Sequence, residues 1–201
     1  YATGSALVTL HQAGIVHTEA LDYRRGLTFL IGSQQIDGSW HVVSRSKPFQ
    51  AYFESGYPER IVEAVEGHAD TILASGAKML TFGGDHFVTY PLLQAHAEKY
   101  GPLSLLHFDA HVDTWQDDGE RLDHGSMFLR ALREGIIVPE KSVQVGIRSR
   151  SDDDYGFTVL DSPWVHEHGT NNTIARIKEV IGDSPTYLTF DIDCLDPAFA
   201  P

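Results

Sequence analysis

Short apolar segments alternate with amphipathic segments of helical length over residues 58–201, and this alternation restricts the fold more than any other feature of the chain. Each apolar segment is long enough for one strand, and the predicted strands span residues 79–82, 103–108, 143–147 and 187–190. Helical spacing of apolar residues, or a closing glycine, predicts helices at about residues 58–76, 89–100, 127–134 and 172–181. Strands separated by helices are typical of an α/β fold, here a doubly wound parallel sheet.

Charge divides the chain into two parts. Residues 1–57 carry four basic and four acidic side chains, whereas residues 58–201 carry the whole net charge of −13. We therefore predict two units with a boundary at 57/58. The negative charge argues against nucleic acid or an anionic membrane as the main partner, and it suits a protein that handles cations.

The composition is that of an ordinary globular protein. No apolar run approaches the roughly 18 residues that a membrane-spanning helix needs, and no signal peptide is recognisable in the first 20 residues. Cys194 is the only cysteine, so no internal disulfide can form. A chain without disulfides favours a reducing, cytoplasmic location.

Acidic residues and histidines follow three of the predicted strands. The motifs are Gly-Gly-Asp-His at 83–86, Asp-Ala-His-Val-Asp at 109–113 and Asp-Ile-Asp at 191–193. Alternate side chains of an extended segment share one face, and the carboxyl ends of parallel strands meet at one edge of the sheet. We therefore expect six side chains to converge there, namely those of His86, Asp109, His111, Asp113, Asp191 and Asp193.

Four carboxylates at one place repel one another and do not all stay ionised unless cations lie between them. Two divalent cations would satisfy them, and a set rich in carboxylates without thiolate favours Mn over Zn. Two bridged cations would acidify a shared water at neutral pH and so supply a hydrolytic nucleophile. Taken singly, each motif is as compatible with solvated acids at a strand end, so the prediction depends on the combination.

Other polar residues are interpreted without a functional role. Residues 152–154 (Asp-Asp-Asp) are expected to form a solvated turn, and Cys194 is expected to pack. His107 lies inside a buried strand, where we expect a core histidine whose hydrogen bonds are satisfied.

These three motifs, with residues 194–201 (Cys-Leu-Asp-Pro-Ala-Phe-Ala-Pro), resemble those of the ureohydrolase family, which contains arginases and agmatinases. The resemblance covers residues 58–201 and implies an arginase-like fold, a binuclear centre of two Mn ions and hydrolysis of a guanidino compound to urea and an amine. It also implies that the six residues above are the metal ligands, with Asp109 and Asp191 bridging. A homo-oligomer is expected for an intact family member.

The resemblance further implies that His124, in Asp-His-Gly at 123–125, handles a proton. A histidine suits this role because its ordinary pKa is near neutrality. As an alternative, His124 is a loop histidine that caps the helix at Ser126. The segment 115–123 lacks the Ser/Gly/Asn stretch of arginases and resembles agmatinases, which implies agmatine as the small guanidino substrate; guanidinobutyrate is an alternative.

Residues 1–57 do not resemble the start of a ureohydrolase. Residues 25–40 (Arg-Gly-Leu-Thr-Phe-Leu-Ile-Gly-Ser-Gln-Gln-Ile-Asp-Gly-Ser-Trp) resemble the QW repeat of squalene cyclase-type α/α-barrel proteins. A single amphipathic helix followed by a glycine turn is the alternative. The first interpretation predicts a chimera, in which a helical repeat fragment without chemistry of its own precedes a ureohydrolase unit that is incomplete at both ends. Such a chain is expected to turn over poorly, or only to bind metal.

Overall fold

The computed structural model describes residues 11, 14, 17–33, 59–116, 122–149 and 151–200. The chain divides into two compact units, residues 1–48 and 49–201, so the boundary lies before the predicted one at 57/58. In the first unit, helix α2 spans Leu21–Ser33. None of the described helices has the length and apolar character needed to cross a membrane.

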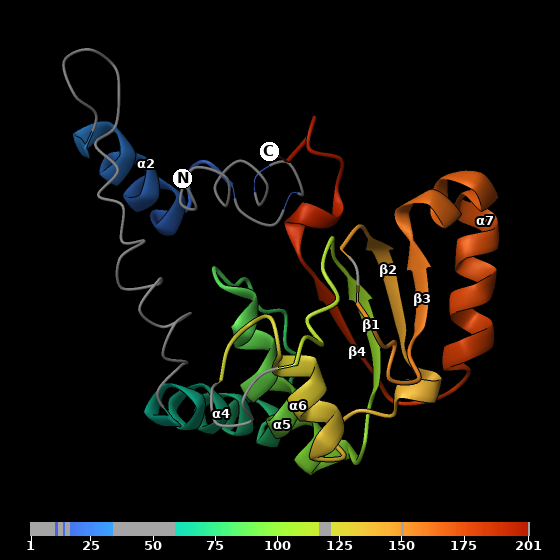
Figure 1. Ribbon diagram of the computed structural model, residues 1–201. Coiled ribbons are helices and arrows are strands. Elements are labelled where there is room, and N and C mark those ends of the chain that lie inside the picture. Colours follow the sequence, from blue (N-terminus) through green and yellow to red (C-terminus); the bar gives the residue numbers. More distant parts are fainter. Residues whose placement is uncertain are drawn as a thin grey trace. The chain divides into compact units, whose positions relative to one another are not determined.

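The second unit is built on a four-stranded sheet (Figure 1). Its strands are β1 (Ser104–Phe108), β2 (Val143–Ile147), β3 (Thr158–Asp161) and β4 (Thr186–Phe190). Their order is β3-β2-β1-β4, and all three pairs are parallel, which confirms the predicted α/β class. Phe108, the last residue of β1, lies opposite both Val145 of β2 and Phe190 of β4, so these strands end close to one level.

Helices cover both faces of this sheet (Figure 1). On one face lie α5 (Thr89–Tyr100) and α6 (Met127–Arg133), with a core that includes Leu93, Leu105 and Phe128. Helix α4 (Glu59–Ala74) packs on α5. On the other face α7 (Ser162–Ile181) covers Val143 and Val145. Burial of these apolar side chains holds the carboxyl ends of the strands in fixed positions.

Local signals explain the ends of α7, which the sequence predicted only from residue 172. The Asp161 side chain caps its first turn by accepting a hydrogen bond from the Trp164 amide at 2.8 Å. Gly169, with φ of 73°, interrupts the helix with a kink, and Gly182, with φ of 58°, ends it. The kink divides the apolar pattern of α7, and this is why residues 162–171 were not predicted as part of the helix.

The predicted strand at residues 79–82 is wrong. These residues have no regular secondary structure, and the side chains of Leu80 and Phe82 are 78% and 73% exposed. An apolar run becomes a strand only when another strand accepts its backbone hydrogen bonds, and no described strand lies in register with this segment. The sequence pattern is local and does not show whether such a partner is present.

In the first unit, α2 is helical, which both interpretations of residues 25–40 predict. Its apolar residues Leu27, Phe29 and Ile31 are exposed, so the described part of this unit buries no apolar helix face. The Gln and Trp positions that define the repeat pattern, between residues 34 and 40, lie outside the described residues.

Candidate metal centre

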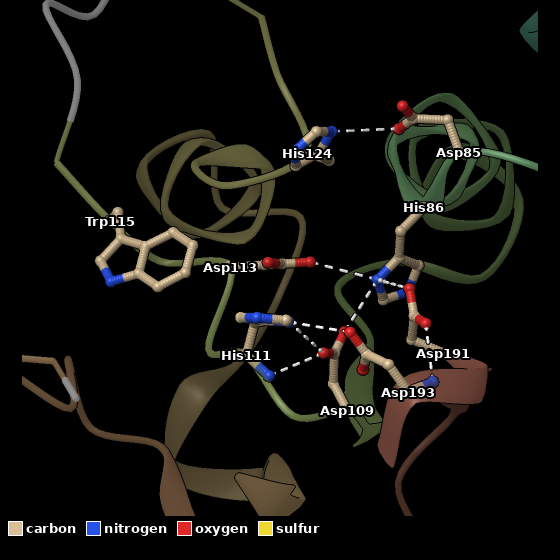
Figure 2. Close-up of a pocket in the computed structure, with 9 residues that line it drawn as sticks. All are labelled: Asp85, His86, Asp109, His111, Asp113, Trp115, His124, Asp191 and Asp193. Atoms are coloured by element: carbon tan, nitrogen blue, oxygen red, sulfur yellow. Dashed lines mark hydrogen bonds and ion pairs between the residues drawn. The ribbon is translucent and has the colours of Figure 1, made fainter. Parts of the chain in front are cut away.

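A cavity of about 380 Å³ opens at the carboxyl ends of β1 and β4 (Figure 2). It is lined by all six predicted metal ligands and by His124. Two further lining residues, Asp85 and Trp115, were not assigned to the site from sequence. Asp85 directly precedes His86 within the first motif, and this position was the sequence signal that could have assigned Asp85 to the site.

Short 3-10 helices and one strained loop present the ligands. Asp85 accepts a hydrogen bond from the Phe87 amide at 2.9 Å and so caps η1 (His86–Val88). Asp191 caps η3 (Ile192–Cys194) in the same way, through the Asp193 amide at 3.1 Å. Between them, Asp113 has a φ of 50°, in the left-handed region that residues with a side chain seldom adopt. Such a conformation persists where surrounding contacts impose it, which is common at functional sites.

The first group of donors surrounds His86. Its Nδ1 lies 2.9 Å from Asp109 Oδ2, 3.1 Å from Asp113 Oδ2 and 3.5 Å from an oxygen of Asp191. His86 Nε2 is hydrogen-bonded to Thr189 at 2.8 Å, which orients the ring. Nδ1 is nevertheless buried without a hydrogen bond of acceptable geometry. A buried nitrogen that faces three carboxylates in this way fits a divalent cation.

The second group surrounds His111. Its Nδ1 lies 3.3 Å from Asp109 Oδ1 and 3.0 Å from Asp193 Oδ2. The other Asp193 oxygen accepts a hydrogen bond from the Ala110 amide at 3.0 Å, which holds that carboxylate in place. Asp109 belongs to both groups, because one of its oxygens faces His86 and the other faces His111. The arrangement suits two neighbouring cations with Asp109 between them.

Electrostatics in the cavity also fit a cation site. Burial lowers the pKa of His86, but Asp109 and Asp113 outweigh it and raise that pKa to about 10. Burial raises the pKa of Asp109, yet its close contacts with His107 and His86 outweigh burial and hold this pKa well below its usual range. Burial is the main cause that raises the pKa of both Asp113 and Asp193. Metal-free, the cluster therefore retains protons that bound cations would replace.

His124 lies at the rim, with Nδ1 at 3.3 Å from Asp85 Oδ1 (Figure 2). That carboxylate is the main cause that raises the pKa of His124. Just before α6, Asp123 Oδ1 accepts hydrogen bonds from the amides of Gly125 and Ser126, at 2.9 and 3.1 Å. His124 lines the cavity. Its role in proton transfer, and the alternative that it caps the following helix, both stay predictions.

Comparisons with known proteins find related sequences for most of the chain. The model of the arginase family matches residues 17–201. The chain is 64% identical over 152 residues to an agmatinase of Chromobacterium violaceum, a match that covers 75% of this chain and 47% of that protein. An agmatinase of Escherichia coli is 55% identical over 146 residues, 73% of this chain and 47% of that protein. This chain thus spans about half the length of the curated relatives it matches.

The solved structures that are similar to this chain include a hypothetical agmatinase and an amidino hydrolase. A hypothetical agmatinase from Burkholderia thailandensis superposes with a TM-score of 0.70 at 61% identity, covering 72% of this chain and 47% of the other. Proclavaminate amidino hydrolase from Streptomyces clavuligerus superposes with a TM-score of 0.66 at 35% identity, over 72% of this chain and 51% of the other. Both share the parallel α/β fold.

The comparisons do not support the predicted chimera. The match to the arginase family begins at residue 17 and therefore includes residues 25–40, the segment that resembles squalene cyclase repeats. Short matches of spacing, such as basic-Gly followed by Phe-Leu, arise readily in any amphipathic helix. The alternative interpretation of residues 25–40 as one helix followed by a glycine turn is consistent with α2 as far as that helix is described.

Proposed function

Because the chain belongs to the arginase family, we propose that it provides the metal-binding part of an agmatinase-type ureohydrolase. The reaction is hydrolysis of a guanidino compound, with agmatine as the preferred substrate, to urea and an amine. The observation that carries the proposal is Asp109, whose Oδ2 faces His86 and whose Oδ1 faces His111, an arrangement that suits two cation positions. The relatives named agmatinase support the choice of substrate.

Two Mn ions fit the donor set best, because carboxylates outnumber imidazoles and no thiolate lines the cavity. His86 and Asp113 would hold one ion, His111 and Asp193 the other, with Asp109 and Asp191 shared between them. When bound, such a pair acidifies a shared water at neutral pH and supplies the nucleophile for hydrolysis.

The other lining residues have separate tasks. The acidic cavity attracts a cationic guanidinium and concentrates it near the donors. Trp115 forms one wall, 5.9 Å from the His111 ring between centroids, where an aromatic face can contact a cation or an alkyl chain. Asp85 favours the protonated form of His124, so His124 is able to give a proton to the departing amine.

The test is urea release from agmatine with added Mn²⁺, on the 201-residue chain and on a longer protein made by extending it to the full length of its agmatinase relatives. We expect turnover from the longer protein and little from the chain alone, because substrate misplaced by about 1 Å reacts about a hundredfold more slowly. Asp109→Asn, which removes the shared carboxylate, should abolish turnover. Mn²⁺ binding by the longer protein without urea release from any guanidino compound would instead favour the non-catalytic alternative.

A further inference from the structure

His107 is a buried histidine whose side chain contacts one of the proposed metal ligands. It lies near the end of β1 with 0% of its surface exposed, two positions before Asp109. Its Nε2 is 2.8 Å from Asp109 Oδ2, the same oxygen that lies 2.9 Å from His86 Nδ1. The imidazole therefore touches a proposed ligand on the side away from the cavity.

Gln144, a buried residue of β2, determines which nitrogen of His107 carries the proton. Its side-chain Nε2 lies 2.7 Å from the carbonyl oxygen of Val112 and 3.2 Å from His107 Nδ1. A backbone carbonyl only accepts, so the group that faces Val112 must be the NH₂ of the amide. The second hydrogen of that NH₂ is then donated to His107 Nδ1. His107 therefore carries its proton on Nε2 and donates it to Asp109.

The same contacts join three parts of the site. Val112 belongs to the loop that carries His111 and Asp113, so Gln144 also anchors the segment with the left-handed residue. The Phe128 ring stands edge-on to His107, with centroids 4.7 Å apart. Each of these partners is buried, so the imidazole has little room to turn.

We propose that His107 and Gln144 form a positioning pair for Asp109, an inference that rests on the proposed metal-binding function. The hydrogen bond from His107 occupies one lone pair of Asp109 Oδ2 and fixes the plane of the carboxylate. Oδ1 and the remaining lone pair of Oδ2 then point to the two cation positions. Partners of this kind orient ligands, and their loss typically costs about 10- to 100-fold in metal affinity or activity.

The experiment measures Mn²⁺ affinity of the 201-residue chain by titration calorimetry. His107→Phe keeps a ring but removes the donor, and we expect binding to weaken about 10- to 100-fold. His107→Gln keeps an N–H at the position of Nε2 and should recover part of the loss. Val143→Ala is the matched control. Val143, in β2, is as fully buried as His107, but its side chain packs on the opposite face of the sheet, against α7. The substitution should lower thermal stability without changing affinity.

Nitrogen NMR of the unsubstituted, metal-free chain provides a second readout, which requires no variant to fold. The pair predicts the Nε2–H tautomer for His107, and Gln144→Met should weaken that preference and Mn²⁺ binding together. Any one of three results would overturn the inference while leaving the proposed metal site intact. These are an Nδ1–H tautomer for His107, an unchanged Mn²⁺ affinity in His107→Phe, and no recovery of Mn²⁺ affinity in His107→Gln. Failure of the unsubstituted chain to bind Mn²⁺ would overturn the proposed metal site and the inference with it.

Discussion

The pKa of His124 depends chiefly on one neighbour, Asp85, whose Oδ1 lies 3.3 Å from Nδ1. Asp85→Asn removes the charge but keeps an oxygen that can cap η1. We expect the pKa of His124 to fall, because the substitution removes the negative charge that is the main cause of its raised pKa. If protonated His124 is the active form, the rate will then decline at a lower pH than in the parent.

Titration of the His124 ring by NMR in parent and variant measures this shift without depending on turnover. Asp154→Asn, at an exposed position outside the cavity, is the control and should leave the pKa of His124 unchanged. An unchanged or raised pKa in Asp85→Asn would contradict the predicted pairing.

Metal binding should release a proton from His86. The pKa of about 10 means that Nδ1 is protonated at neutral pH in the metal-free protein. A cation must displace that proton, so affinity should fall about tenfold for each pH unit below 10. Calorimetry in buffers of different ionisation enthalpy should detect about one proton released at pH 7.5. A Mn²⁺ affinity that does not vary between pH 6 and 9 would show that binding does not displace a proton from His86.

At the scale of elements, β2 contains a backbone position that requires glycine. Gly146 has a φ of 90°, and the β2–β3 register shifts between Val145 and Ile147. A Cβ at this position would lie 3.4 Å from the carbonyl oxygen of Asp109. Gly146→Ala should therefore destabilise the fold by about 1–3 kcal/mol, measured by urea unfolding.

Gly67→Ala provides the comparison for this substitution. Gly67 lies inside α4, and a Cβ there meets no atom within 4 Å. Alanine favours a helix interior by about 1 kcal/mol over glycine, so this variant should be more stable than the parent. If the two substitutions changed the free energy of unfolding equally, the positive φ of Gly146 would not explain the loss of stability.

Elements with strong local signals could be predicted from sequence, and elements that depend on partners could not. The apolar runs of β1, β2 and β4 predicted strands, and the motifs after β1 and β4 predicted which side chains converge. Residues 79–82 have an equally apolar pattern but no strand to pair with. The contact between His107 and Gln144 joins positions 37 residues apart, and no periodicity in the sequence indicates it.

At the scale of the whole chain, β4 is an edge strand of the described sheet, paired only with β1. Its Leu188 and Phe190 side chains are 59% and 50% exposed. An apolar edge of this kind is a site for self-association. We expect the purified chain to associate with increasing concentration, and Leu188→Lys to shift it toward the monomer in sedimentation experiments.

Ile174→Lys tests whether any added charge has this effect, since Ile174 is an exposed apolar residue of α7, away from the edge. It should leave association unchanged. Equal solubilisation by both substitutions would indicate that net charge, and not the edge of β4, governs association.

The contact between His86 and Thr189 joins positions 103 residues apart. The proposed ligands from His86 to Asp113 are synthesised before β4, so at that stage the site would lack Asp191 and Asp193. Domains tend to fold as units once enough of the chain has been synthesised. A cation can be enclosed on all sides only after β4 has docked beside β1. Under the proposed metal-binding function, capture of a cation would report that the sheet is assembled, and the cation would act as a reversible cross-link between an early and a late segment of the chain.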